Sequence, residues 1–367
     1  MEKRLPRVAI THGDMNGISY EILIKTFAEP MILDLVCPII YGSSRAYEYW
    51  SKLLKIDNDT PWKIIKHPRE AKQGEINLID VCKDPIEISP GNISTEAGHA
   101  AFKALEMAIE DTNQGQCDIL VTAPINKAAM PQDVFPYKGH TDYIATKLGI
   151  DPKEVLMILF SNNTRVALAT THCAVKDIPQ LLSKELLINK LSLLERSLVQ
   201  DFEIVKPRIA LLSLNPHAGD KGLMGNEEET LLKPVIEECI SQNIFTFGPY
   251  APDGFFGSDQ MFLFDGILAL YHDQGLAPFK ALFMNSGVNF TAGLPIVRTS
   301  PDHGTGYDIV GKGIADPTSM RAAIFAGLDI FRSRKRFQRA TRNPLRKAKF
   351  DRGNDNEKLD PIEEDAD

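Results

Sequence analysis

The chain alternates short apolar segments with Gly-containing turns and helical segments, and this alternation restricts the fold more than any other feature. The first unit has an apolar strand at residues 8–11, a turn at 12–17 and a helix at 20–27. The same order returns with a strand at 36–41 and a helix from Arg45. Strands that alternate with helices form largely parallel sheets with helices on both faces. We therefore predict an α/β fold.

The pattern continues to about residue 270. Further strands are expected at residues 76–81, 118–124, 155–160, 165–171, 208–214 and 266–270. Further helices are expected at 95–113, 184–200 and 227–243, with Thr95 as the candidate N-cap of the first. In such sheets ligands bind beyond the carboxyl ends of strands, so functional residues are expected there.

The length of 367 residues exceeds the size at which one core usually keeps growing, and two lobes with a cleft between them are expected. The first α/β lobe is predicted to be discontinuous, formed by residues 1–130 plus 303–331. The second α/β lobe is predicted at 131–302. Residues 332–367 form a charged C-terminal extension.

Composition indicates a cytoplasmic protein without a nucleic-acid or membrane partner. The net charge is −8, no secretory or membrane-spanning segment is evident, and the five cysteines form no Cys-x-x-Cys pair. Charge in the extension is uneven, with ten Lys or Arg in 332–352 and seven Asp or Glu in 353–367. A solvated extension is favoured over an arm that binds a polyanion.

Three histidines follow predicted strands: His172, His217 and His272. Neutral imidazoles that converge from strand ends form open divalent-metal sites, in which other positions remain for water or substrate. Asp220 and Asp273 lie near enough in sequence to act as outer partners that fix an imidazole tautomer. One histidine alone is usually structural, but this set favours a metal site.

A second group of residues is suited to an anion. His140 and Thr141 precede a helix expected from about Tyr143, and helix N-termini attract anions, although Thr141 could be only an N-cap. Three further residues add positive charge and an amide: Lys280, Asn289 and Arg298. Arg298 follows an apolar segment, which favours contact with a ligand over a solvent-exposed side chain without a function.

Two Gly-containing turns, at residues 12–17 and 302–306, could approach a dinucleotide. Neither is a Gly-x-Gly-x-x-Gly sequence after a strand, so the ordinary dinucleotide fingerprint is absent. These residues alone leave the cofactor open.

Across about residues 6–330 the chain resembles the 4-hydroxythreonine-4-phosphate dehydrogenase family of pyridoxal phosphate biosynthesis. Seven ordered blocks carry the resemblance: Ile10-Thr11-x-Gly13-Asp14 with Gly17 and Glu21, Gly139-His140-Thr141, Ala169-Thr170-Thr171-His172, Leu214-Asn215-Pro216-His217-Ala218-Gly219, Tyr271-His272-Asp273-Gln274-Gly275-Leu276, Gly287-Val288-Asn289, and Arg298-Thr299-Ser300-x-Asp302-His303-Gly304-Thr305.

The resemblance implies a two-lobed α/β/α fold, like that of isocitrate and isopropylmalate dehydrogenases, and a homodimer with its active site at the interface. It implies that the three histidines hold one divalent metal (zinc, cobalt, manganese or magnesium), one of them reaching across from the other subunit. It implies a phosphate site of His140, Thr141, Lys280, Asn289 and Arg298. NAD would oxidise 4-phosphooxy-L-threonine, which would lose carbon dioxide to give 3-amino-2-oxopropyl phosphate in vitamin B6 biosynthesis.

Several points stay open at this level. The group that removes the hydroxyl proton could be Lys280, Asp253 or a metal-bound hydroxide, with Lys280 as the candidate catalytic residue. The substrate could instead be 4-phospho-threonate or 4-phospho-erythronate, and a metal-dependent phosphate-ester hydrolase or an idle binding protein are more distant alternatives. The run Met15-Asn16-Gly17-Ile18-Ser19-Tyr20-Glu21 also departs from the Pro-Ala-Gly-Ile-Gly-Pro-Glu run of the family, and His12 stands where Pro is common.

Overall fold

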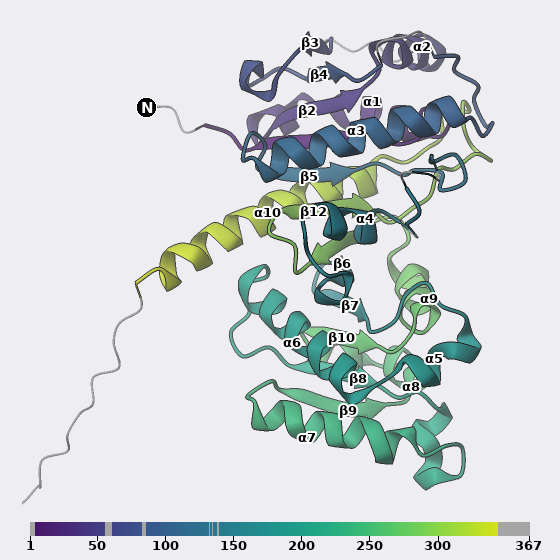
Figure 1. Ribbon diagram of the computed structural model, residues 1–367, viewed down its shortest axis with the longest axis vertical. Helices are drawn as coiled ribbons and strands as arrows, with labels where there is room; N and C mark the ends of the chain where they lie inside the picture. The colour runs from purple at the N-terminus through teal and green to yellow at the C-terminus, as the bar shows by residue number, and fades with distance from the viewer. Residues whose placement is uncertain are drawn as a thin grey trace, which may run out of the picture.

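In the computed structural model, which describes residues 4–55, 61–82, 86–131, 133, 135–137 and 139–343, one 12-stranded sheet runs through both halves of the molecule (Figure 1). Its strands are β1 Arg7–Thr11, β2 Cys37–Gly42, β3 Lys63–Ile65, β4 Asn77–Asp80, β5 Ile119–Thr122, β6 Leu156–Ser161, β7 Thr164–Leu168, β8 Ile209–Leu212, β9 Thr246–Tyr250, β10 Gly266–Ala269, β11 Val288–Ala292 and β12 Val297–Pro301. Their spatial order is β3-β4-β2-β1-β5-β12-β11-β6-β7-β10-β8-β9.

The sheet is mixed. The pairs β11–β12, β11–β6 and β6–β7 are antiparallel, and the other neighbouring strands are parallel. The predicted α/β class is confirmed, with antiparallel strands joining two parallel halves. The lobe boundaries near residues 131 and 302 stay a prediction.

Helices cover both faces of the sheet (Figure 1). They are α1 Ser19–Phe27, α2 Ser44–Leu54, α3 Thr95–Asn113, α4 His140–Lys147, α5 Ile178–Leu181, α6 Lys184–Gln200, α7 Lys233–Ser241, α8 Pro252–Phe256, α9 His272–Phe283 and α10 Thr318–Thr341. The expected N-cap of α3 is wrong by one residue. Ser94 has an extended backbone, and its Oγ accepts a hydrogen bond from Ala97 N at 3.2 Å, so Thr95 lies inside the helix.

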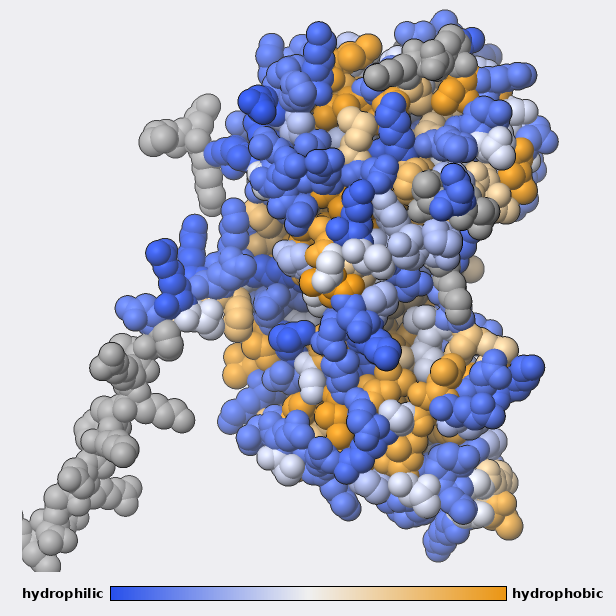
Figure 2. Space-filling model, in the orientation of Figure 1, coloured by the Kyte–Doolittle hydropathy of each residue, from blue (hydrophilic) through white to orange (hydrophobic). Residues whose placement is uncertain are grey.

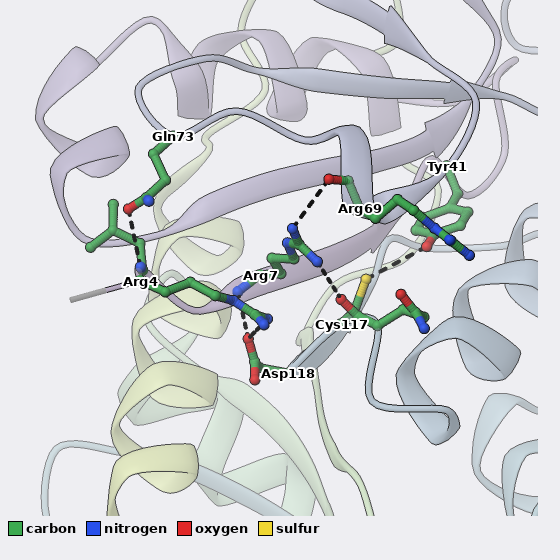
Figure 3. Close-up of polar contacts among 9 residues, drawn as sticks. Arg4, Arg7, Tyr41, Arg69, Gln73, Cys117 and Asp118 are labelled. Atoms are coloured by element: carbon green, nitrogen blue, oxygen red, sulfur yellow. Dashed lines mark hydrogen bonds and ion pairs between the residues drawn. The ribbon is translucent and has the colours of Figure 1, made fainter. Parts of the chain in front are cut away.

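The amino ends of the central strands are tied by polar contacts (Figure 3). Asp118, which precedes β5, accepts hydrogen bonds from Arg7 N at 2.8 Å and from Arg4 Nη2 at 2.9 Å. The side chain of Arg7 also reaches the carbonyl oxygens of Gln116 and Arg69. These contacts stabilise the edge of the sheet away from the carboxyl ends of the parallel strands, which leaves the carboxyl ends for the functional site.

Helix α10 extends beyond the sheet, and its last turns project away from the body (Figure 1). It includes the first ten residues of the predicted extension, 332–341. The acidic stretch at 353–367 lies outside the described residues. In the part of the chain that the structure describes, no helix combines the length and apolar character needed to cross a bilayer.

Candidate active site

A cavity of about 340 Å³ lies where β5, β7 and β12 end and α4 begins. All five residues predicted to bind phosphate line it, and so does one of the predicted metal ligands. These residues are His140, Thr141, Lys280, Asn289, Arg298 and His172. The fold therefore brings predicted residues from five separate segments of the chain into one cavity.

Arg298 is the most unusual group of this cavity, because it is a buried cation. It lies in β12 with 2% of its surface exposed, and it donates hydrogen bonds to Thr291 Oγ1 at 3.1 Å and to Thr122 Oγ1 at 2.6 Å. Among the described residues no carboxylate pairs with it and its Nε has no partner. Burial lowers the pKa of Arg298 to about 10, which leaves it charged at neutral pH. A buried charge without a counter-ion favours an anionic ligand.

His140 opens α4 beside this cation. The helix begins three residues earlier than expected, because Gly139 is extended and acts as the N-cap, so Thr141 lies in the first turn and is not the cap. Burial, together with the charges of Arg298 and Lys127, holds the pKa of His140 well below its usual value. Its buried Nε2 has no hydrogen-bond partner among the described residues. A neutral imidazole and a helix N-terminus therefore face the same cavity.

Lys280 also lines the cavity and pairs with Asp302, to which the sequence interpretation gave no role of its own. The Nζ to Oδ1 distance is 3.1 Å. Burial raises the pKa of Asp302, although the ammonium of Lys280 opposes the shift. His303 follows in the same wall, where its pKa is lowered by burial. A lysine held by a largely buried carboxylate can exchange a proton with a bound substrate.

Lys190 is a second residue that the sequence interpretation missed. It lines the cavity from α6 and donates hydrogen bonds to the carbonyl oxygens of Lys153 at 2.8 Å and Val155 at 2.7 Å. The signal was available, because position 190 falls on the apolar stripe of its helix with Leu187 and Leu194. The ammonium group of Lys190 thus holds the segment at residues 153–155 beside the cavity.

The three predicted metal ligands do not meet within one chain. The rings of His172 and His272 have centroids 6.1 Å apart, and Asp273 Oδ1 lies 2.6 Å from His272 Nδ1, as expected for an outer partner. Among the described residues no group of three His, Cys, Asp or Glu side chains is arranged to hold a metal ion. Imidazole nitrogens are donors that divalent metals accept, and of the three predicted ligands His172 and His272 lie close together.

His217 lies in a left-handed turn that the sequence did not predict. Five consecutive residues, 217–221, have φ between 41° and 79°, and four of them carry side chains. This conformation costs L-residues roughly 1–2 kcal/mol each. The two residues Leu214 and Asn215, which lead into the turn, are held by the buried carboxylate of Glu228. It accepts hydrogen bonds from Leu214 N at 2.9 Å and Asn215 N at 2.8 Å. Strain of this kind is characteristic of functional segments.

The two Gly-containing turns form one unit beside the cavity. Ile18 N donates a hydrogen bond to Thr305 O at 2.9 Å, and a Cβ on Gly17 would lie 2.6 Å from the same oxygen. Asp14 accepts a hydrogen bond from Tyr307 OH. Gly304 borders open space and lines the cavity, so backbone at this turn is accessible to a ligand.

The unusual residues of the first turn have structural partners. Asn16 Oδ1 accepts a hydrogen bond from Ser89 N at 2.9 Å, and its Nδ2 donates to Asn92 O at 3.1 Å. Tyr20 OH accepts from Ser43 N at 2.7 Å. These hydrogen bonds fix the turn and the start of α1 to neighbouring loops.

This geometry defines an α/β enzyme whose cationic site lies at the carboxyl ends of its strands. The model of the family "Pyridoxal phosphate biosynthetic protein PdxA" matches residues 34–326. The chain therefore belongs to the PdxA family, and it is an oxidoreductase of the dehydrogenase type.

The chain is similar to dehydrogenases that are named for two related phosphorylated substrates. The 4-hydroxythreonine-4-phosphate dehydrogenase of Bacteroides thetaiotaomicron is 48% identical over 367 residues, which cover 100% of both chains. The D-threonate 4-phosphate dehydrogenase of Cupriavidus necator is 35% identical, over 90% of this chain and 98% of that protein. The crystal structure of 4-hydroxythreonine-4-phosphate dehydrogenase from Klebsiella pneumoniae has a TM-score of 0.77 at 32% identity, covering 89% of this chain and 100% of that chain.

Proposed function

We propose that the protein catalyses the NAD-dependent and metal-dependent oxidation of 4-phosphooxy-L-threonine, followed by decarboxylation to 3-amino-2-oxopropyl phosphate. In this reaction a hydride passes from C3 to NAD, and the resulting β-keto acid loses its carboxylate as carbon dioxide. The observation that carries the proposal is Arg298, a buried cation without a carboxylate partner among the described residues, in a cavity with four other groups suited to phosphate. The 48% identical relative named for this substrate supports it.

The phosphate would be bound by groups from three elements: β12, α4 and β11. Arg298 offers a planar pair of N–H donors, and the first turn of α4 offers Thr141 and backbone N–H groups. Neutral His140 donates or accepts one hydrogen bond without adding charge, and Asn289 contributes its amide. Binding the phosphate at this end orients the rest of the substrate for reaction.

The metal would be held by His172 and His272 of one subunit and His217 of a second copy. When bound, a divalent metal supplies a Lewis acid that favours loss of the substrate hydroxyl proton and stabilises the charge that develops on decarboxylation. The residues of the chain determine where this happens, because the two imidazoles lie beyond β7 and β10, next to the cavity.

Lys280 is our candidate for the group that handles the hydroxyl proton. Asp302 holds its amine at 3.1 Å, on the cavity wall that leads to the turn at residues 302–306. NAD would lie against this turn, where Gly304 has no side chain to exclude it. The pair then lies between the phosphate site and the cofactor.

A homodimer is part of the proposal, because no group of three His, Cys, Asp or Glu side chains among the described residues of a single chain is arranged to hold a metal ion. The half of the molecule that carries His217 exposes large apolar side chains, including Val175 at 74%, Leu223 at 78% and Phe262 at 64%. Hydrophobic surface, in orange, is visible on the lower half of the molecule in Figure 2. Exposed apolar surface of this kind is common where subunits meet.

A second candidate has the same phosphate and metal contacts but a different acid. The 35% identical relative named for D-threonate 4-phosphate makes a phosphorylated sugar acid the alternative substrate. The two differ at C2, where the first has an amino group and the second a hydroxyl. The relative named for D-threonate 4-phosphate is less similar to this chain than the relative named for 4-hydroxythreonine-4-phosphate, and this favours 4-phosphooxy-L-threonine as the substrate.

The test is a steady-state comparison of 4-phosphooxy-L-threonine, 4-phospho-D-threonate and 4-phospho-D-erythronate with NAD and a divalent metal. We expect the first to give the highest kcat/KM, with one NADH and one carbon dioxide per substrate. Turnover of only the sugar-acid phosphates would contradict the leading proposal. Release of inorganic phosphate without NADH would contradict both candidates.

A further inference from the structure

Arg334 is a buried arginine in α10, beyond residue 326 where the match to the family model ends. Its side chain is 8% exposed and its Nε donates a hydrogen bond to Asp201 Oδ1 at 2.6 Å. Its Nη1 donates to the carbonyl oxygens of Leu294 and Ile296, both at 3.0 Å. All of these contacts leave the helix and reach other elements.

The two carbonyl groups belong to the turn that joins β11 to β12. These strands carry two of the phosphate residues, Asn289 and Arg298. The guanidinium of Arg298 is held across the hairpin by Thr291 Oγ1 at 3.1 Å. The geometry of the turn therefore determines where this guanidinium lies.

The opposite side of the turn packs against main chain. Gly293 has φ +87°, and a Cβ there would lie 2.2 Å from Glu154 O. Lys190 holds the same segment through the carbonyl oxygens of Lys153 and Val155. Because Lys190 and the C-cap residue Asp201 both belong to α6, one helix supports both sides of the turn.

We propose that Arg334 is a positioning residue for the substrate phosphate. It fixes the β11–β12 turn against the C-terminal end of α6, so that Asn289 and Arg298 are already oriented when the phosphate arrives. A buried ion pair is weak evidence for stability, but it does hold one geometry, since its charges and the two carbonyl groups need these partners. The inference rests on the proposed function, because the ligand that it concerns is the phosphate.

Arg336 offers a matched control. It lies two residues further along α10 and forms an exposed pair with Glu203, with Nε to Oε1 at 2.5 Å and Nη2 to Oε2 at 2.8 Å. Among the described residues Arg336 forms no hydrogen bond or ion pair with the β11–β12 turn, so Arg336→Ala removes an ion pair of the same helix without releasing the hairpin.

The experiment measures binding of inorganic phosphate by calorimetry, and KM and kcat for 4-phosphooxy-L-threonine, in the full chain. Arg334→Lys keeps the charge but cannot span the carboxylate and both carbonyl groups with a planar fork. We expect Kd for phosphate and KM to rise about tenfold, with kcat within about twofold, while Arg336→Ala changes neither. Asp201→Asn, a milder change on the other side of the pair, should shift both constants in the same direction.

Two results would overturn the inference. If Arg334→Lys lowers the melting temperature but leaves phosphate binding and KM at wild-type values, Arg334 has only a structural role. If it lowers kcat and leaves KM unchanged, the phosphate is not what it positions. Absence of phosphate binding by the wild-type protein is a different outcome, because it removes the phosphate site and the proposed function together with this inference.

Discussion

Arg298 Nη2 lies 2.6 Å from Thr122 Oγ1, so the buried cation of β12 is held by a hydroxyl at the end of the neighbouring strand β5. A hydroxyl orients a guanidinium without neutralising it. Among the described residues Arg298 has no carboxylate partner, and it therefore keeps its charge for a ligand.

Replacing this arginine should weaken phosphate binding. Arg298→Lys loses the planar pair of donors, and we expect KM to rise by about 10- to 100-fold, as for loss of one charged hydrogen bond of ~1.5–3 kcal/mol. Thr122→Val should give a smaller rise in KM, because it removes only one of the two hydroxyl groups that orient Arg298. Thr122→Ser keeps the hydroxyl and is the control. Steady-state kinetics with unchanged KM in Arg298→Lys would exclude this phosphate site.

Metal binding should depend on the left-handed turn at 217–221. Glu228→Ala removes the acceptor for Leu214 N and Asn215 N, and the strained turn can then relax. We expect a loss of roughly 10- to 100-fold in affinity for zinc or cobalt, with phosphate binding unchanged. Titration of the metal-free protein measures this. Glu229→Ala, next to it and exposed, is the control, and equal losses in both variants would contradict the role of Glu228.

Removing the metal should separate binding from reaction. Treatment with a chelator should abolish NADH formation, while calorimetric binding of inorganic phosphate persists because the cationic cavity is formed by protein groups alone. Activity should return with added zinc, cobalt, manganese or magnesium to different extents. Full turnover in the chelated protein would remove the metal from the proposal.

Stability should fall in mild acid because of His12. Burial lowers the pKa of this fully buried histidine to about 4, against 6.5 for an ordinary histidine. The unfolded chain takes up a proton below pH 6.5 while the folded protein does not, so stability decreases between pH 6.5 and 4 and levels off below. The shift corresponds to about 3 kcal/mol.

Denaturant unfolding at pH 7 and pH 4.5 tests this. Between pH 7 and pH 4.5 the free energy of unfolding should fall clearly less in His12→Leu than in the wild-type protein. Some decrease should remain in the variant, because burial also lowers the pKa values of His140 and His303. His67→Leu, which removes an exposed histidine, serves as the control. An identical pH dependence in wild type and His12→Leu would show that His12 is not buried as described.

Most of the parallel part of the fold could be predicted from the sequence, because buried parallel strands are short apolar runs. Helix α6 has the predicted bounds, and β1 and α1 differ from the prediction by one residue. The antiparallel hairpin β11–β12 was missed. Its strands include the polar residues Asn289 and Arg298, which interrupt the apolar pattern that indicates a buried strand.

The five residues of the proposed phosphate site could be named from the sequence, and all of them line one cavity, but their geometry could not be predicted. His140 and Arg298 are far apart in sequence, and only the fold shows that one is neutral beside the other. The left-handed turn at His217 could not be predicted, because nothing local in Ala218 or Asp220 requires positive φ. Glu228 holds the residues that lead into that turn from another element.

The central claim is that two subunits complete each active site, with a phosphate cavity and two imidazoles from one and His217 from the other. The most direct test mixes two inactive variants, His172→Ala and His217→Ala, under conditions that exchange subunits. Each mixed dimer then has one site with both changes and one intact site, so activity should recover to about one quarter of wild type. A mixture of His172→Ala with His272→Ala should stay inactive. Each site takes both of these histidines from one subunit, so each site of the mixed dimer lacks one of them. No recovery in the first mixture, or equal recovery in both, would contradict the shared site.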